Sequence, residues 1–232
     1  MTVVGWKYGH MPRYIDLSHT LRDGLVTMPG MPAPTVSLHL GREQSRSVYA
    51  EGTEFEIPIV RMVANTGTYL DTPFHRYGDG HDLAGLPLAR VVDLRAEVIH
   101  VDVHAERGIT PEMFDGRDLR GAAVLLHTGW DRHFGTETYS SPAPFLTRAG
   151  AAHLVDQGVT LVGIDSINID DMTADAAGER PAHSVLLAAD IPIVEHLTKL
   201  SEVPSTGARF TAVPPKFEAF GTFPVRAFAT VD

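Results

Sequence analysis

Short apolar runs bounded by turn-forming residues recur along the whole chain, and they constrain the fold more than any other feature. Runs of four to eight residues rich in β-branched and aromatic side chains are typical of β-strands. Residues 55–62 alternate between a face with Phe55, Ile57 and Ile59 and a face of mixed character, and Pro58 predicts that this strand lies at an edge or carries a bulge. The other expected strands are residues 14–17, 36–40, 98–101, 122–126, 161–164, 191–195, 210–213 and 225–228.

Helical patterns are fewer. One helix is expected to begin at Thr110, with Pro111 at the first helical position, and another to run over residues 147–157, where Gly158 supplies the left-handed stop. A third is expected at about residues 183–189. No repeat or linker divides the chain, so we expect one strand-rich α/β domain over residues 1–232.

Composition excludes several classes of protein. The 19 basic and 29 acidic residues give a net charge of −10 without a basic cluster, so nucleic acid is not an expected partner. The chain has no cysteine, which excludes disulfides and thiolate metal ligands. No apolar run reaches the roughly 18 residues of a membrane helix, and the first residues are too polar for a secretory signal. We therefore expect a cytoplasmic enzyme with a small-molecule substrate and no membrane partner.

The segment from Asn65 to His75 carries the strongest indication of chemistry. It places the carboxylate of Asp71 and the imidazole of His75 four residues apart, in backbone that Gly67 and Pro73 shape. These two residues alone leave a structural role equally open, with Asp71 capping a turn and His75 packing as a hydrogen-bonded surface residue.

A second group of polar residues lies downstream. Asp165 follows an apolar run, His183 comes later, and Glu195 ends the run Ile-Pro-Ile-Val. A carboxylate buried at the end of an apolar strand is costly unless it is paired or coordinated. The alternative is that Glu195 forms a salt bridge with Lys199 or an arginine while His183 caps its helix.

The sequence also suggests residues that line a pocket, and it contains histidines for which no functional role is expected. The proline-rich loop over residues 28–34 is expected to line a pocket. His127, which directly precedes Thr128-Gly129-Trp130, is a weaker candidate for the same pocket, and a structural role is the favoured alternative. The remaining histidines without a partner pattern are interpreted as structural: His39, His100, His104, His133 and His153.

Together these segments resemble the cyclase superfamily of metal-dependent hydrolases, of the kynurenine formamidase and isatin hydrolase type. The family pattern His-x-Gly-Thr-His-x-Asp-x-Pro-x-His aligns without a gap to Asn65 through His75. The spacing of His183 and Glu195 resembles the family's second metal segment. The other matches are Ile15-Asp16-Leu17-Ser18, Thr128-Gly129-Trp130 and Gly163-Ile164-Asp165-Ser166, so the resemblance covers essentially the whole chain.

The resemblance implies a swivelling β/β/α fold, one or two divalent ions such as zinc or manganese, and a homodimer or homotetramer. Carried over by position, the metal ligands are Asp71, His183 and Glu195. His75 is the acid/base residue, or a ligand in relatives with a single ion. The implied activity is that of a metal-dependent hydrolase acting on C–N bonds other than peptide bonds.

Two departures from the family pattern bear on the number of ions. Asn65 and Tyr69 stand where the family has its first two histidine ligands. Asparagine offers a weak neutral oxygen, and a phenol with a pKa near 10 is a poor ligand when neutral. We therefore expect one ion per chain, because three protein ligands suffice for a catalytic site. Asn65, Tyr69 and Trp130 are then expected to contact the substrate.

The expected function is hydrolysis of a small amide, lactam or lactone by a water that the ion activates, with His75 as acid/base. N-formylkynurenine, from tryptophan catabolism, is the substrate that the resemblance suggests, as for an arylformamidase. Two alternatives stay open at this point. One is a metal-assisted lyase or cyclase, and the other is a non-catalytic protein that binds a small molecule on the same fold.

Overall fold

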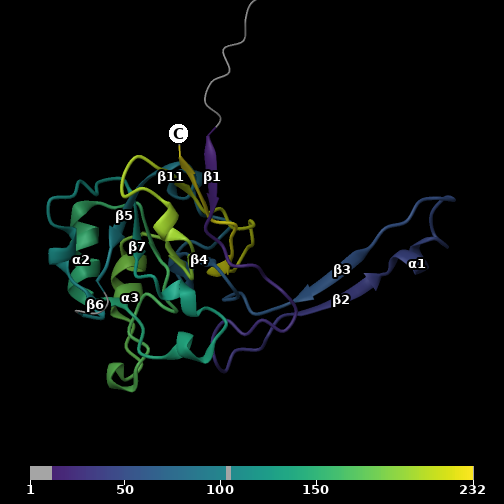
Figure 1. Ribbon diagram of the computed structural model, residues 1–232, viewed down its shortest axis with the longest axis horizontal. Helices are drawn as coiled ribbons and strands as arrows, with labels where there is room; N and C mark the ends of the chain where they lie inside the picture. The colour runs from purple at the N-terminus through teal and green to yellow at the C-terminus, as the bar shows by residue number, and fades with distance from the viewer. Residues whose placement is uncertain (1–11, 103–105, 232) are drawn as a thin grey trace, which may run out of the picture.

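A nine-stranded mixed sheet forms the body of the computed structural model, which describes residues 12–102 and 106–231 (Figure 1). Its order is β1-β13-β11-β5-β7-β9-β10-β4-β12. The central strands β5, β7, β9 and β10 are parallel, and antiparallel strands flank them on both sides. The strands are β1 (Arg13–Asp16), β4 (Tyr69–Asp71), β5 (Leu94–His100), β7 (Ala123–His127), β9 (Leu161–Ile164), β10 (Ile193–Glu195), β11 (Arg209–Thr211), β12 (Thr222–Pro224) and β13 (Phe228–Val231).

Two-stranded sheets and short helical turns complete the described part of the chain. One small sheet pairs β2 (Thr35–Leu40) with β3 (Ile57–Arg61), and the other pairs β6 (Gly108–Ile109) with β8 (Phe145–Leu146). Single turns of 3₁₀-helix punctuate the loops: η1 (Pro73–His75), η2 (Leu88–Arg90), η3 (Pro111–Phe114), η4 (Trp130–His133), η5 (Glu137–Ser140), η6 (Ala174–Ala176) and η7 (Leu200–Glu202).

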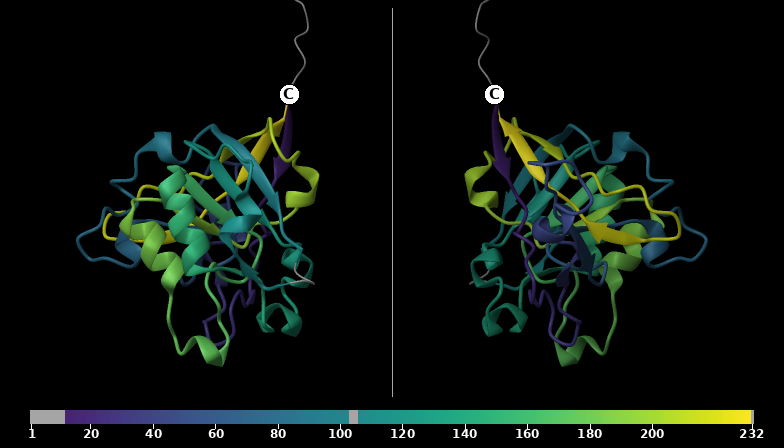
Figure 2. Two further views of the ribbon diagram at one scale, coloured as in Figure 1. Left: turned by 90° about the vertical axis from the view of Figure 1, so that its left-hand side faces the viewer. Right: turned by 90° about the vertical axis from the view of Figure 1, so that its right-hand side faces the viewer.

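Helices α2 (Arg148–Gln157) and α3 (Pro181–Ala188) lie side by side against one face of the sheet (Figures 1 and 2). Leu154 and Leu186 belong to the apolar cluster on that face, together with Ile193 of β10. A second cluster, with Leu17 and Phe210, covers the other face. Burial of both faces explains why the central strands are almost continuously apolar. No helix within the described ranges has the length and apolarity needed to span a membrane.

Helix α2 confirms its prediction in detail. Thr147 is the N-cap and its hydroxyl accepts a hydrogen bond from the amide of Gly150 at 3.0 Å. Gly158 ends the helix with a φ of 71°. Helix α3 begins at Pro181, two residues before the expected start, because proline suits the first helical turn.

Two expected elements differ from their predictions. Thr110 is the N-cap and Pro111 the first residue as expected, but the helix is the single 3₁₀ turn η3 and Thr110 accepts no capping hydrogen bond. The strand expected over residues 225–228 overlaps β13 only at Phe228, and residues 225–227 lie in the gap between β12 and β13. There the Val225 amide donates to the carbonyl of Thr68 at 3.0 Å, and the Ala227 amide donates to the Ser18 hydroxyl at 2.7 Å. Neither amide therefore takes part in regular strand pairing.

The segment from β2 through α1 (Arg42–Ser45) to β3 projects from the body as an arm (Figure 1). Its strands pair only with each other. The prediction from Pro58 is confirmed, since β3 is an edge strand and the pairing shifts register beside the Leu38–Pro58 pair. The arm leaves large apolar side chains exposed: Val36, Leu38, Val48, Phe55, Ile57, Ile59 and Val60.

Candidate metal centre

Strand β4 brings the first candidate residues to the centre of the fold. It lies antiparallel between β10 and β12, with Tyr69 opposite Glu195 and Asp71 opposite Ile193. Alternate residues of a strand share one face, and directly paired residues share a face too. Tyr69, Asp71 and Glu195 therefore lie on the same face of the sheet. The three-residue strand was not foreseen because it is too short to show alternation.

The carboxylate of Asp71 is completely buried, and neither oxygen has a hydrogen-bond partner among the described residues. Two imidazoles lie nearby. His75 Nδ1 is 3.9 Å from one Asp71 oxygen, and His183 Nε2 is 3.6 Å from the other. Both distances are too long for hydrogen bonds. Buried carboxylates are normally paired or coordinated, so this arrangement fits a cation between the three side chains.

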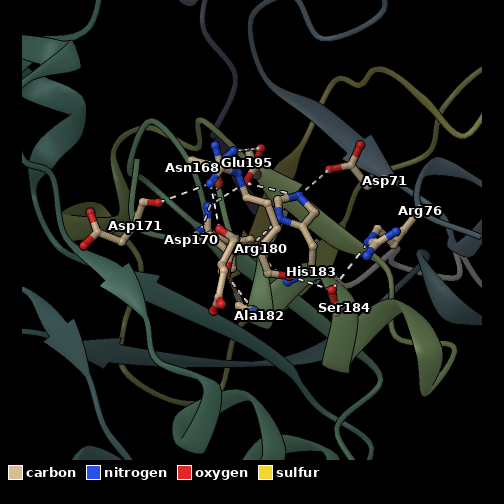
Figure 3. Close-up of polar contacts among 12 residues, drawn as sticks. Asp71, Arg76, Asn168, Asp170, Asp171, Arg180, Ala182, His183, Ser184 and Glu195 are labelled. Carbon is tan, nitrogen blue, oxygen red and sulfur yellow. Dashed lines mark hydrogen bonds and ion pairs between the residues drawn. The ribbon is translucent and has the colours of Figure 1, made fainter. Parts of the chain in front are cut away.

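His183 is held as metal-binding histidines usually are. Its Nδ1 lies 2.7 Å from Oδ2 of Asp170, and both side chains are buried (Figure 3). This contact leaves Nε2 directed toward Asp71, and toward Glu195 Oε1 at 3.7 Å. A carboxylate on the far nitrogen fixes the tautomer and orientation of an imidazole ligand.

Asp170 also positions the helix that carries His183. Its two oxygens accept hydrogen bonds from the backbone amides of Ala182, at 2.6 Å, and His183, at 3.1 Å. The alternative in which His183 caps α3 is therefore wrong, since Asp170 occupies the first-turn amides. Sequence analysis missed Asp170, which follows the Gly-Ile-Asp-Ser segment by four residues and has no recognisable spacing to α3.

Glu195 is fully buried, and its partners are not those of a surface salt bridge. Tyr69 donates a short hydrogen bond to Oε2, and the amide of Ile169 donates to Oε1 at 2.5 Å. The Asn168 amide lies 3.4 Å from Oε2. The alternative pairing of Glu195 with Lys199 is therefore wrong.

Burial and neighbouring charges shift the acid–base behaviour of this group. Burial raises the pKa of Glu195 to about 7, with the His183 cation opposing the shift and Asp71 adding to it. Burial would lower the pKa of His183, but the bond to Asp170 and the charges of Asp71 and Glu195 raise it to about 10. A bound cation replaces that proton, because imidazole must be neutral to act as a ligand.

The phenol of Tyr69 stays protonated. Burial, followed by the neighbouring Glu195 and Asp71 charges, raises its pKa well above the ordinary value. Its hydroxyl hydrogen is directed to Glu195, and Asn65 is hydrogen-bonded to the same hydroxyl. Tyr69 therefore acts as a neutral donor to Glu195, a contact that the sequence did not predict.

Contacts from the end of β10, next to Glu195, hold the start of β4 in place. Thr68 donates its hydroxyl hydrogen to the carbonyl of His196 at 2.6 Å and accepts a bond from the amide of His19 at 3.0 Å. His196 is fully buried, has a φ of 55°, and its Nδ1 lies 2.7 Å from the hydroxyl of Tyr139. These contacts fix the position of Tyr69 and Asp71 relative to Glu195.

Among the described residues, Asp71, His75 and His183 form the group whose potential ligand atoms all lie within 4.8 Å of one another. Glu195 adjoins His183 without belonging to that group. The geometry therefore places His75 close enough to be a ligand itself. The assignment of Glu195 as third ligand and His75 as acid/base stays a prediction.

A cavity of about 540 Å³ opens above these residues. Asn65, Tyr69, His75 and His183 line it, as expected for a site built on this segment. The proline-rich loop contributes Met28 and Met31; the remaining lining residues are Arg76, Arg148, Asn168, Met172, Gly178, Glu179, Arg180, Pro181 and Ser184.

Two residues expected at the pocket lie elsewhere. Trp130 is not part of the cavity lining; its indole donates to the carbonyl of Tyr139 at 3.1 Å, and its ring packs beside Met28 and Ala143. His127 is not part of the lining either, and its Nδ1 lies 2.8 Å from that of His100. His127 ends β7 and faces His100 at the end of β5, whereas Trp130 in η4 faces Tyr139 in η5.

The Cyclase family model matches residues 15–171 of the chain. The kynurenine formamidase of Geobacillus thermodenitrificans is 30% identical over 220 residues, which cover 94% of this chain and 97% of the relative. Isatin hydrolase A from Labrenzia aggregata, solved with benzyl benzoate, is similar in structure with a TM-score of 0.80 and 22% identity, covering 95% of this chain and 94% of that one. A solved structure described as a potential metal-dependent hydrolase with cyclase activity has a TM-score of 0.75 and 21% identity, covering 96% and 99% of the two chains. At these identities the structural matches establish the fold.

Substitution of Asp170 tests whether His183 is a metal ligand. Asp170→Asn removes the charged partner of Nδ1, and we expect metal affinity to fall by roughly tenfold to a hundredfold, as for other partners of histidine ligands. The measurement is competition with a chelator of known affinity, followed by metal analysis. Asp171→Asn is the matched control, because that neighbouring carboxylate pairs with Arg107 instead. A folded Asp170→Asn protein with the affinity of the wild type would contradict this role of His183.

Proposed function

Because the chain belongs to the cyclase family, we propose that it is a metal-dependent hydrolase of a small amide, lactam or lactone. The observation that carries the proposal is the buried carboxylate of Asp71, which faces His75 and His183 at the floor of the cavity without a hydrogen-bond donor. Relatives named kynurenine formamidase and structural neighbours named isatin hydrolase support hydrolysis of a C–N bond. We propose N-formylkynurenine as the first substrate to test.

The residues present fit one divalent ion. Asp71 and His183 supply a carboxylate oxygen and an oriented imidazole nitrogen, and Glu195 or His75 completes three ligands. Mixed oxygen and nitrogen donors suit zinc or manganese. When bound, such an ion lowers the pKa of water and polarises a carbonyl group.

His75 is the residue best placed to move a proton. Its side chain is 33% exposed and lines the cavity, whereas that of His183, which also lines the cavity, is 8% exposed and that of Asp71 is fully buried. An imidazole at the boundary between the ion site and the substrate can accept a proton from the attacking water and deliver it to the leaving nitrogen.

Asn65 is the better candidate for a hydrogen bond to the substrate carbonyl. The hydroxyl hydrogen of Tyr69 is already directed to Glu195, which leaves Tyr69 no second hydrogen for an oxyanion. The amide of Asn65 has two hydrogens and lines the cavity. We therefore assign Tyr69 to holding Glu195, and Asn65 to positioning the carbonyl oxygen of the substrate.

Substitution of His75 tests the hydrolytic proposal. His75→Gln should lower kcat for N-formylkynurenine hydrolysis by roughly a hundredfold, the usual contribution of general acid/base catalysis, while the bound ion is retained. His153→Gln, on the surface of α2 next to Phe114, is the control and should leave the rate unchanged.

Loss of the ion together with the rate would instead make His75 a ligand. An unchanged rate in the His75 variant would remove its catalytic role. Wild-type protein loaded with zinc or manganese that hydrolyses no formyl-amide, lactam or lactone would contradict the proposed function itself.

We also propose that the chain assembles into a homodimer or homotetramer through the arm. A two-stranded hairpin is marginally stable alone in water, and this one exposes Leu38, Ile59 and Phe55 at about half of their surface or more. Two ion pairs lie within the arm, Arg42 with Glu56 and Arg46 with Glu54. The exposed apolar side chains are therefore the surface that a partner would cover. A second copy of this chain can cover it through apolar contacts, although both copies carry the same net charge.

Light scattering after size-exclusion chromatography tests the assembly. The wild type should elute as a dimer or tetramer, and the double variant Val36→Lys, Leu38→Lys should shift to monomer because it places two charges on the face of the arm that also carries Val60. Ser37→Lys, a polar position on the same strand, is the control and should keep the wild-type mass. A monomeric wild type at micromolar concentration would contradict this assembly.

A further inference from the structure

Three arginines line the same cavity as the candidate metal site. Arg76 follows η1, Arg148 is the first residue of α2, and Arg180 is the N-cap of α3. We call them the rim arginines. They come from separate elements that only the fold brings together, in a chain whose net charge is −10. A concentration of positive charge at one opening of an acidic protein calls for an explanation.

None of the rim arginines forms an ion pair with a carboxylate of the described residues. Arg76 makes one 3.4 Å contact, from Nε to the Ser184 hydroxyl, and lies 5.4 Å from the centre of the Tyr77 ring (Figure 3). Nine other arginines do pair with carboxylates within the described ranges: Arg13, Arg42, Arg46, Arg90, Arg95, Arg107, Arg117, Arg209 and Arg226.

The other two rim arginines are equally available. Arg180 donates only to backbone carbonyls, those of Glu179 at 2.7 Å and Asp171 at 3.4 Å. Arg148 has no hydrogen bond or ion pair with any described residue, and it is exposed. One carboxylate, that of Glu179, also lines the cavity. The rim therefore keeps an excess of positive charge.

Two helix ends add to the positive electrostatic potential at the cavity. The N-terminal ends of α2 and α3, which carry Arg148 and Arg180, place the positive ends of two helix dipoles at the cavity. Some first-turn amides are already engaged, that of Gly150 by Thr147 and those of Ala182 and His183 by Asp170. The guanidinium groups are the charged donors that remain for a ligand.

We propose that the rim arginines bind a carboxylate group of the substrate, so that the enzyme acts on amides that carry a carboxylate. This inference rests on the proposed hydrolytic function. Guanidinium groups match the two oxygens of a carboxylate with paired hydrogen bonds. Met31 and Met172, on the cavity wall, supply adaptable apolar contacts for the carbon skeleton between the two ends.

The proposal also fixes the orientation of the substrate. The three guanidinium groups lie outside the proposed ligand group, whereas His75 and His183 line the cavity next to the buried carboxylates of Asp71 and Glu195. A substrate whose carboxylate is bound by the arginines therefore presents its scissile amide to His75. A neutral amide of the same size lacks this second attachment and binds in more than one orientation.

Binding of a matched pair of small probes tests the subsite without requiring turnover. In titration calorimetry on the wild type, benzoate should bind at least tenfold more tightly than nitrobenzene, its neutral isostere. Arg76→Met, Arg148→Met and Arg180→Met should each weaken benzoate binding by roughly fivefold to tenfold, about the value of one charge-assisted contact at a solvated site. Arg120→Met is the control, an exposed arginine without an ion pair and outside the cavity lining, and should bind benzoate as the wild type does.

Hydrolysis of a second matched pair separates this inference from the proposed function. The wild type should hydrolyse 2-formamidobenzoate with a kcat/KM at least tenfold above that for formanilide, and the rim variants should lose that preference mainly through KM. Hydrolysis of both compounds with equal efficiency would overturn the inference and leave the hydrolase proposal standing. Selective benzoate binding that depends on the rim arginines, without hydrolysis of any amide, would uphold the subsite and contradict the hydrolase. Benzoate binding that is unchanged in all three variants would overturn the subsite outright.

Discussion

A single unsatisfied carboxylate, that of Asp71, organises the functional half of this molecule. It is completely buried, it lies in the middle of a three-strand arrangement, and no described donor reaches either oxygen. The groups nearest to its oxygens are the imidazoles of His183, at 3.6 Å, and His75, at 3.9 Å, which are too far away for hydrogen bonds. A fold keeps such a costly group when a cation completes it. The cavity, the oriented His183 and the restrained Glu195 all follow from holding that cation next to a substrate.

The sheet determines which residues surround Asp71. Pairing of β4 with β10 sets Tyr69 against Glu195, and helix α3 presents His183 to both carboxylates. This strand pairing also explains the role of Tyr69, one of the two departures from the family's histidine pattern. Tyr69 donates to Glu195 where a histidine would ligate, so the substitution converts a ligand position into a support for another carboxylate. The proposal of one ion site, where the family pattern provides for two, rests on this change.

Residues with local signals were predictable from the sequence, and residues that depend on the packing of distant segments were not. The cap and stop of α2, the edge position of Pro58 and the fold class follow from patterns within a few residues. Asp71, His75, His183 and Glu195 could be proposed from the sequence because they match the spacing of a family pattern, and the fold brings them close together. Asp170 and the rim arginines have no such spacing, and only the tertiary fold places them at the site. Trp130 was misplaced because a residue after a strand end can turn away from the cavity as easily as into it.

Metal-dependent thermal stability tests the role of Asp71 most directly. An ion that binds only the folded chain raises its stability according to the ratio of free ion to Kd, by about 2.7 kcal/mol at a hundredfold excess. For a chain of this size that corresponds to a rise in Tm of roughly 5–10 °C. Zinc or manganese added to chelator-treated wild type should produce this rise, and Asp71→Asn should show little or none. A wild type whose Tm does not respond, or an Asp71→Asn protein that responds equally, would contradict the account.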